Sequence, residues 1–506
     1  MDVDAITALL SDPQTHGGQP VEVIRTHAAL VFLAGEHALK IKRPVVYDYL
    51  DFSRPETRRD MLAREIDLNR PAAPEIYGDL VPITRAADGR LALDGDGVAV
   101  EWALRMRRFP AEAELSRIAA RGELTSELAA RLGTVVADYH LAAPQRTAAG
   151  PDLIVEILDE LGRVFAEIPG AIPPAEAADF DRAARACLRR VSGLLARRAA
   201  QGWVRRCHGD LHLRNLVLID GRPVPFDALE FDERLGTMDV LYDLAFLLMD
   251  LLNSRLATAA NIVLNRWLAG MRDPAHLDAL AALPLFLAIR AAIRAMVAGQ
   301  RAEGAGGAEG QDAVAEARAY MAAARAYLAP APPRLVAVGG LSGSGKTTLA
   351  AALSPQIGPA PGAVHLRSDL IRKELAGVGE TDRLPPERYT PEANARVYAA
   401  LHALSRRALA AGHGVVLDAA HLAPEERAAT AAAAGGHPFT GLWLDAAPEV
   451  LIARVDARSG DASDADAAVV RRQLTRSGAV TDWGRIDATG GPAEALASAR
   501  ALIDPT

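Results

Sequence analysis

Apolar and polar residues alternate along the chain in two different patterns. Near the start, short runs at 21–27, 29–34 and 38–42 have the length and composition of β-strands. Longer Ala-rich stretches, about 125–141 and 175–200, follow them with the spacing of helices. Strands followed by helices predict a small antiparallel sheet and then a helical region.

The pattern changes in the last third of the chain, where short apolar runs alternate with segments of helical periodicity. These runs lie at 335–338, 364–369, 414–418 and 442–445. They are continuous rather than alternating, which is typical of strands buried on both faces of a parallel sheet. We therefore expect an α/β domain with a mainly parallel sheet over 335–506.

A Pro-rich stretch at 329–334 separates the two patterns. Such a stretch forms a short, stiff connector. It predicts a domain boundary, with one domain over 1–328 and a second over 335–506. The total of 506 residues is sufficient for two large domains.

The segment after the first predicted parallel strand is rich in glycine and ends in Lys346 and Thr347. Glycines allow the backbone N–H groups and the following helix N-terminus to point at phosphate oxygens. The lysine can reach the β- and γ-phosphates, and the threonine hydroxyl is placed for Mg²⁺. This pattern assigns nucleotide binding to Gly340, Gly343, Ser344, Gly345, Lys346, Thr347 and Thr348.

Acidic and basic residues follow the other predicted strands of this domain. Asp369 ends a strand and can act as the base for an acceptor hydroxyl, with Arg372 one helical turn later to hold a polar or anionic substrate group. Asp418 ends the next strand, where a carboxylate reaches Mg²⁺ through water. Arg454 and Arg458, four residues apart on a helix, can close over the transferred phosphate. The alternative is structural, with a helix cap and solvated charges.

A second set of phosphate-handling residues lies in the first domain. Asp210 and Asn215 are five residues apart in a loop, and Asp227 ends the hairpin that follows. A base and two oxygen ligands for Mg²⁺ on one hairpin are what phosphoryl transfer requires. Lys40 on a predicted strand and Glu65 on the next helix can pair beside the phosphates, although each can also be a solvated charge.

The loop from His208 to Asn215, together with Asp227, resembles the catalytic loop and metal motif of aminoglycoside phosphotransferases and choline kinases. The resemblance covers about 20–325 and implies a two-lobed, α+β protein-kinase-like fold. One departure is the absence of a glycine-rich loop at 26–29. The roles that the resemblance implies are catalytic base for Asp210, Mg²⁺ ligands for Asn215 and Asp227, and a nucleotide-positioning pair for Lys40 and Glu65.

The P-loop, its following acid and arginine, and Asp418 resemble the P-loop kinases of the polynucleotide kinase, zeta-toxin and chloramphenicol phosphotransferase group, over about 334–504. The whole chain thus resembles a fusion of the two kinds of kinase. We expect structural roles for Asp239 and Asp243, which follow the catalytic hairpin and can tie it to the next helix.

The composition of the chain argues against some classes of binding partner and favours one cellular compartment. The formal net charge of -8 argues against an extended nucleic-acid or anionic-membrane surface. Cys187 and Cys207 are too few for a disulfide framework and suit a reducing compartment. The apolar stretch near 241–252 is interrupted by Asp243 and Asp250, so we expect no membrane span and a cytoplasmic protein.

These features predict a bifunctional phosphotransferase that uses ATP, or GTP, with Mg²⁺. Each site would transfer the γ-phosphoryl group to a hydroxyl of a small polar molecule, such as a sugar, an aminoglycoside-like or a nucleoside-like compound. Two alternatives stay open: one active P-loop kinase with a regulatory or substrate-binding kinase-like domain, and a polynucleotide 5′-hydroxyl kinase. The acceptor depends on pocket shape rather than on phosphate-handling motifs, and the oligomeric state is open.

Overall fold

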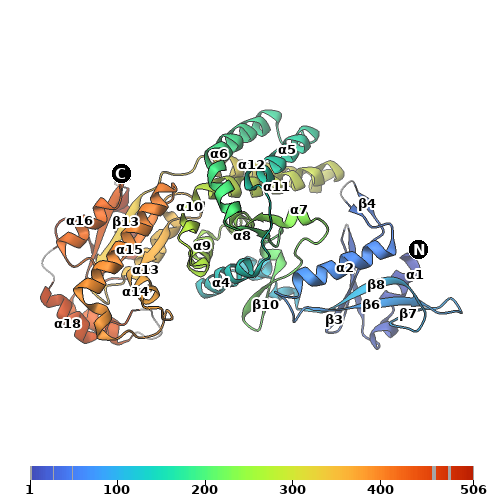
Figure 1. Ribbon diagram of the computed structural model, residues 1–506, viewed down its shortest axis with the longest axis horizontal. Helices are drawn as coiled ribbons and strands as arrows, with labels where there is room; N and C mark the ends of the chain where they lie inside the picture. Colours follow the sequence, from blue (N-terminus) through green and yellow to red (C-terminus); the bar gives the residue numbers. More distant parts are fainter. Residues whose placement is uncertain (1–2, 27, 48–49, 458–462, 477–479, 505–506) are drawn as a thin grey trace. The chain divides into compact units, whose positions relative to one another are not determined.

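The structure is a computed structural model, and it describes residues 3–26, 28–47, 50–457, 463–476 and 480–504 (Figure 1). The chain forms two compact units. The first unit comprises Met1–Leu153 and Arg197–Asp250, and the second comprises Ile154–Ala196 and Leu251–Thr506.

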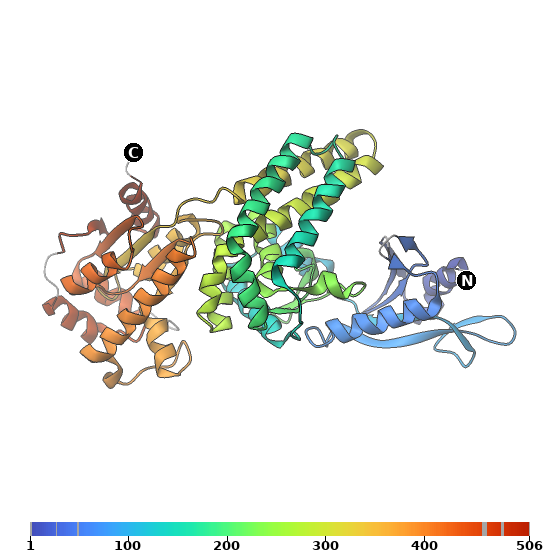
Figure 2. The same cartoon turned by 45° about the horizontal axis from the view of Figure 1, so that its top comes forward.

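A six-stranded sheet opens the first unit, with the strand order β1-β2-β3-β8-β6-β7 and antiparallel pairing between neighbours. Helix α2 (Pro55–Asn69) lies along it, as Figure 2 shows. Leu62 and Ile66 of α2 pack against Tyr77 and Leu104 of the sheet. The strands are β1 (Val21–Arg25), β2 (Ala29–Ala34), β3 (His37–Lys42), β6 (Tyr77–Arg85), β7 (Leu91–Leu93) and β8 (Val98–Arg107).

Smaller elements complete the first unit and carry the predicted catalytic loop. Strands β10 (Leu216–Ile219) and β11 (Arg222–Pro225) form a hairpin, and β9 (Val204–Arg206) pairs with β12 (Thr237–Asp239). The helices and short strands beside them are α1 (Val3–Ser11), β4 (Val46–Tyr47), β5 (Leu50–Asp51), α3 (Leu115–Ala120), α4 (Ser126–Ala142), α7 (Glu233–Gly236) and α8 (Val240–Asn253). A small antiparallel sheet followed by helices confirms the predicted α+β class.

The second unit begins with long helices. Those that bundle together in Figure 2 are α5 (Gly150–Glu167), α6 (Pro174–Ala200), α11 (Leu283–Gly304) and α12 (Gly307–Tyr327), with α9 (Ala257–Met271) and α10 (Ala275–Ala279) between them in sequence. The stretch Ala275–Gly304 is long and apolar enough to cross a membrane, but 67% of its most apolar window is buried inside the fold. That burial is typical of a core helix.

The rest of the second unit is an α/β layer with five parallel strands in the order β14-β15-β13-β16-β17. This confirms the predicted parallel sheet. The strands are β13 (Leu335–Gly340), β14 (Val364–Arg367), β15 (Val415–Asp418), β16 (Phe439–Asp445) and β17 (Gly484–Asp487); the helices are α13 (Lys346–Leu353), α14 (Ser368–Ala376), α15 (Pro391–Ala410), α16 (Pro424–Ala432), α17 (Pro448–Asp456), α18 (Ala467–Arg476) and α19 (Pro492–Ile503).

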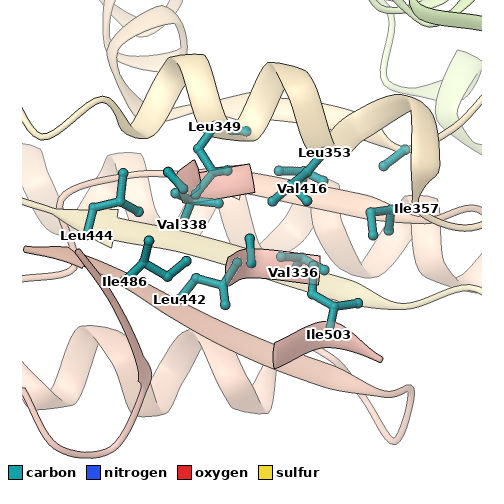
Figure 3. Close-up of a cluster of buried hydrophobic side chains, with 14 of the residues drawn as sticks. Val336, Val338, Leu349, Leu353, Ile357, Val416, Leu442, Leu444, Ile486 and Ile503 are labelled. Carbon is teal, nitrogen blue, oxygen red and sulfur yellow. The ribbon is translucent and has the colours of Figure 1, made fainter. Parts of the chain in front are cut away.

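The central strand β13 is buried on both faces. Val336 and Val338 pack with Leu349 of α13 in the cluster of Figure 3. Ala337, which lies between them, points to the opposite face and packs near Trp443. Burial on both faces explains the continuous apolar run in the sequence, and it holds the end of β13, where the glycine-rich loop begins, in a rigid position.

His413 makes the stability of this layer depend on pH. Its Nε2 lies 2.8 Å from the carbonyl oxygen of Gly362, and burial lowers the pKa of the imidazole to about 4, although that hydrogen bond opposes the shift. The unfolded chain, with an ordinary pKa near 6.5, therefore binds more protons than the folded chain between these pH values. Stability present above pH 6.5 is lost as the pH falls toward 4.

We expect the free energy of unfolding to fall by about 2 kcal/mol between pH 7 and pH 5 because of His413. Urea unfolding of the wild type and of His413→Gln at both pH values measures this contribution. Glutamine can donate to Gly362 but does not titrate, so the variant should lose the corresponding part of the pH dependence. His437→Gln, a change in a half-buried loop histidine, is the control. An unchanged pH dependence in His413→Gln would show that His413 does not cause it.

Candidate active sites

The glycine-rich loop between β13 and α13 depends on backbone conformations that favour glycine. Gly343 and Gly345 have φ angles of +83° and +90°, in the left-handed region. A Cβ atom on Gly343 would also lie 2.4 Å from the carbonyl oxygen of Leu451, whereas one on Gly345 would meet nothing within 4 Å. Gly340 lies beneath the loop, where a Cβ atom would be 2.7 Å from Ser344 Oγ. The loop can therefore bring its backbone N–H groups close to a phosphate.

Gly343→Ala and Gly345→Ala should differ in stability because of this contact. Both variants place alanine in a left-handed conformation, at a cost of about 1–2 kcal/mol. Only Gly343→Ala adds a collision, which costs about 1–3 kcal/mol more. Urea unfolding of the two full-length variants measures the difference. Equal stability would contradict the tight approach of α17 to the loop at Gly343.

The first residues of α13 meet the end of β15. Lys346 Nζ donates to the carbonyl oxygen of Leu341 at 2.9 Å, and Thr347 Oγ1 donates to Asp418 Oδ2 at 2.6 Å. Burial of Asp418 tends to raise its pKa, but His365, Lys346 and Thr347 together lower it below its usual range. Asp418 is therefore ionised and lies against the threonine hydroxyl.

Asp369 and Arg372 extend this group of residues from α14. Burial raises the pKa of the Asp369 carboxyl, and the neighbouring charge of Asp418 adds to the effect. The Arg372 guanidinium lies over the ring of Tyr389, 4.8 Å from its centroid, and donates to the carbonyl oxygen of Arg388 at 2.8 Å. Stacking and hydrogen bonding thus hold Arg372 in one orientation.

The side chains of Lys346, Thr347, Asp369, Arg372 and Asp418 all line one cavity of about 990 Å³. The glycine-rich loop and residues of α14 and α18 line it. The predicted site residues that line it are Gly343, Gly345, Lys346, Thr347, Thr348, Asp369, Arg372 and Asp418.

Arg454 is the one member of the predicted arginine pair that the structure describes. Arg454 donates to the carbonyl oxygen of Ala488 at 2.8 Å, and the cavity lining among the described residues does not include it. Arg458 lies outside the described residues. Helix α18 instead supplies Arg472 to the cavity, and its Gln473 Oε1 accepts the Ser342 N–H at 2.8 Å. The sequence signal for α18 was an amphipathic stretch with two adjacent arginines after a polar turn.

In the first unit, Lys40 on β3 joins the helix α2 to the loop after β11. Its Nζ lies 2.7 Å from Glu65 Oε1 and 2.8 Å from Asp227 Oδ1. Burial tends to lower the pKa of Lys40, but Asp227, Glu65 and other neighbours raise it well above its usual value. The charge of Lys40 holds the pKa of Asp227 at about 2. All three groups are therefore ionised together.

Lys42 extends this chain of ion pairs, a feature that we did not predict. Its Nζ lies 2.7 Å from Glu65 Oε2 and 2.6 Å from Glu230 Oε1, and only 3% of the residue is exposed. The spacing Lys40-x-Lys42 places both lysines on one face of β3, which is the signal that the sequence contains. The second lysine ties β3 to the segment just after Asp227.

The backbone of Asp227 is held as firmly as its side chain. Asp227 has a left-handed φ angle of +60°, which is uncommon for a residue with a side chain. Its N–H donates to the Tyr77 hydroxyl at 2.9 Å, and the next N–H, of Ala228, donates to Asn69 Oδ1 at 2.8 Å. These contacts come from the sheet and from α2, so both elements aim the carboxylate toward Lys40.

The predicted catalytic loop brings Asp210 and Asn215 into contact. Asn215 Nδ2 donates to Asp210 Oδ2 at 2.8 Å and to the Asp210 carbonyl oxygen at 3.0 Å. His208 donates through Nε2 to the Phe226 carbonyl oxygen at 2.9 Å, and its Nδ1 accepts the Asp210 N–H at 3.3 Å. The histidine thereby connects the loop to the strand end that precedes Asp227.

Two buried aspartates follow this loop in sequence, and one of them contacts it. Asp243 accepts the N–H groups of His208 and Gly209 at 3.2 Å and 2.9 Å, and His140 Nε2 lies 3.1 Å from it. Asp239 forms a bidentate pair with Arg198, with both distances at 2.7 Å. Neither aspartate lies among the predicted reacting groups: Asp243 positions the loop through its two N–H groups, whereas Asp239 ties α6 to the start of α8.

Three acids after the metal motif are used inside the protein. Glu230 binds Lys42, and Asp232 accepts the Arg234 N–H at 2.7 Å as a helix cap. Glu233 binds the guanidinium groups of three arginines. These carboxylates already bind cationic or N–H groups of the protein. They are therefore not positioned to bind the positive charges of a polycationic acceptor. The three arginines are Arg64, Arg146 and Arg206.

Comparisons with known proteins give relatives of the whole chain and of its last third. Residues 335–479 match the family described as "AAA domain". Uncharacterized proteins of Mycobacterium bovis and Mycobacterium tuberculosis are 30% identical to this chain over 497 residues, which is 94% of this chain and 93% of theirs. The likeness to the mycobacterial proteins thus extends over both units.

Solved structures resemble separate parts of the chain. A choline/ethanolamine kinase family protein from Mesorhizobium loti is 17% identical, covers 65% of this chain and 99% of its own, and gives a TM-score of 0.39. A gluconokinase from Sinorhizobium meliloti is 24% identical, covers 34% of this chain and 94% of its own, and gives a TM-score of 0.24. This chain belongs to the family of the mycobacterial proteins, and its residues 335–479 match the AAA domain family.

Proposed function

We propose that the protein is a bifunctional, ATP-dependent phosphotransferase with two separate nucleotide sites. One observation carries the proposal: each unit has a lysine and several side-chain oxygens of the kinds that phosphoryl transfer uses, and we assign them the roles of phosphate binding, general base and metal ligation. In the first unit these groups are Lys40, Asp210, Asn215 and Asp227; in the second they are Lys346, Asp369, Thr347 and Asp418. The acceptors are hydroxyl groups of small polar molecules.

At the P-loop site, Asp369 takes the proton of the acceptor hydroxyl. The acceptor oxygen forms a bond to the γ-phosphorus of ATP as the bond from that phosphorus to the β,γ-bridging oxygen breaks, and ADP leaves. The raised pKa of Asp369 makes its carboxylate a stronger base than an ordinary aspartate. Lys346 and Arg372 stabilise the negative charge of the phosphates and orient the acceptor, and Arg472 closes the site from α18.

At the first site, Asp210 takes the acceptor proton and Lys40 holds the phosphates. Lys40 now lies between Glu65 and Asp227, so a bound nucleotide would take over part of its coordination. Glu65 then keeps the ammonium in position, because its second oxygen is fixed by Lys42. Asn215 orients Asp210 through the hydrogen bond between their side chains.

The donor atoms at both sites fit Mg²⁺, which prefers oxygen ligands. Asp210 accepts both N–H groups of the Asn215 side-chain amide. The side-chain oxygen of Asn215, Oδ1, can therefore bind a cation together with the Asp227 carboxylate. In the second unit the oxygens of Thr347 and Asp418 lie 2.6 Å apart. When bound, the ion neutralises phosphate charge. GTP can replace ATP in this scheme, since the contacts that we propose are to the phosphates and not to the base.

We also propose the domain bounds 1–328 and 335–506, joined by the connector 329–334. Both cysteines, Cys187 and Cys207, are buried and free, which supports a cytoplasmic location.

The experiment that tests the function is phosphate transfer by the full-length protein with ATP and Mg²⁺. The acceptors are a panel of sugars, aminoglycosides, nucleosides and 5′-hydroxyl oligonucleotides, and product mass is the readout. A gain of one phosphate mass on a small molecule supports the proposal. Phosphorylation of oligonucleotides alone would favour the polynucleotide kinase instead.

A specific observation favours one alternative, in which the first unit binds but does not transfer. The sequence between β1 and β2 contains no glycine, and Thr26 Oγ1 accepts the Ala29 N–H at 2.9 Å. That N–H group is therefore not available to a phosphate. Loss of all phosphate transfer when Asp369 is replaced by asparagine would support this reading.

A further inference from the structure

The outer edge of β14 is paired by side chains rather than by another strand. β14 is the first strand of the parallel sheet and pairs with β15 on its inner side. On its outer side, Asn265 of α9 donates to the Ala363 carbonyl oxygen at 3.1 Å and accepts the His365 N–H at 2.7 Å. Asn261 donates to the same carbonyl oxygen at 3.0 Å. The amide of Asn265 thus replaces the hydrogen bonds of a missing strand.

These hydrogen bonds are partly shielded from solvent, with Asn265 and His365 half-buried. Ala363 is fully buried, and Asn261 is only 3% exposed. Asn265 Nδ2 also lies 3.0 Å from the Asn261 carbonyl oxygen, one helical turn earlier. A buried backbone group that loses its partner costs about 1–3 kcal/mol, so α9 and β14 are tightly connected. An apolar side chain at position 265 could fill the space but could not satisfy both backbone groups.

Two ion pairs extend the contact on either side. Arg266 of α9 binds Glu380 beyond α14 at 2.8 Å, and Arg407 of α15 binds Asp278 of α10 at 2.6 Å and 2.8 Å. All of these residues belong to the second compact unit. Helices α9 and α10 precede the Pro-rich connector in sequence, yet α9 holds the edge of the parallel sheet and α10 binds α15.

Strand β14 leads directly into the P-loop site. His365 and Arg367, which alternate along it, each have a nitrogen 3.8 Å from Asp418 Oδ2. The strand ends at Arg367, and α14 begins with Ser368 and Asp369. A small shift of β14 would therefore move two cationic or polar groups near Asp418 and also the proposed base.

We propose that Asn265 is a positioning residue for phosphoryl transfer at the P-loop site. It holds β14 through its backbone, and β14 in turn holds Asp369 and the groups that face Asp418. The site of the α/β layer is therefore completed by a helix from the region before the connector. This inference rests on the function proposed above for the P-loop site.

The test uses full-length Asn265→Leu, with Asn253→Leu as the matched control. Asn253 Nδ2 donates to the Tyr320 hydroxyl at 3.2 Å, a helix contact that does not involve β14. In Asn265→Leu we expect at least about tenfold faster hydrogen exchange at the His365 amide, which loses its acceptor. We also expect kcat of the Asp369-dependent transfer to fall about 10–100-fold, with KM for ATP and the Asp210-dependent product unchanged.

Asn265→Gln, which keeps the amide, should restore part of both properties. Unchanged exchange at His365 in Asn265→Leu would overturn the proposal, and so would faster exchange with unchanged kcat. If the wild type transfers no phosphate at this site, the proposed function fails. The exchange result then decides separately whether Asn265 holds β14: faster exchange supports that, and unchanged exchange rejects it.

Discussion

Replacement of Lys346 by methionine is expected to lower phosphoryl transfer at the P-loop site by about 10²–10³-fold. Lys346 is the cation at the start of α13, it lines the cavity with Asp369 and Asp418, and its Nζ is already oriented by the Leu341 carbonyl oxygen. Methionine keeps the length of the side chain but removes the charge that offsets the phosphates. The measurement is the initial rate of product formation, together with ATP affinity by calorimetry.

Arg383→Met is the control for this change. Arg383 also lines the cavity, but its side chain is 74% exposed, and its Nη2 is 3.6 Å from Asp466. Since exposed charges contribute little, the rate should stay within about fivefold of the wild type. A Lys346→Met variant that keeps the wild-type rate would contradict a phosphate-binding role for the loop.

Asp210→Asn is expected to lower transfer at the first site by about 10²–10⁴-fold, the usual contribution of a general base. Asparagine has nearly the same shape and can still accept a hydrogen bond from Asn215. It cannot take a proton from an acceptor hydroxyl, so the loss should appear in kcat rather than in nucleotide affinity.

Asp220→Asn provides a matched control on the same hairpin. Asp220 lies in the turn between β10 and β11 with a φ angle of +49°, a conformation that asparagine tolerates well. Its replacement should leave both products unchanged. If Asp210→Asn keeps the wild-type rate and product, Asp210 is not the base, and transfer at the first site has no candidate acid–base residue among the predicted ones.

The phosphate-binding loop could be predicted from the sequence because its chemistry is local. A strand, the glycines and the Lys346-Thr347 pair are consecutive, so their arrangement needs no knowledge of distant contacts. The catalytic loop is local in the same way, since Asp210 and Asn215 are five residues apart and contact each other directly. The parallel strands could also be predicted from the sequence, because burial on both faces produces continuous apolar runs.

Residues that act across long sequence separations were harder to find. The Lys42–Glu230 pair joins positions 188 residues apart, and nothing in the sequence around Lys42 shows that its partner lies in the loop after β11. Arg472 and Gln473 are indistinguishable from solvated helix residues until α18 approaches the loop. Arg454 had the better helical spacing for a lid, but the segment after β17 binds its guanidinium. Asn265 reveals its role only through the edge of a strand about a hundred residues later.

The most direct test of two active sites in one chain compares Asp210→Asn and Asp369→Asn on the same acceptor panel, with ATP, Mg²⁺ and product mass as readout. The account predicts that each variant loses a different phosphorylated product and keeps the other. If Asp210→Asn changes nothing while Asp369→Asn abolishes all transfer, the first unit is a binding or regulatory module, and the claim of two phosphotransferase sites is wrong.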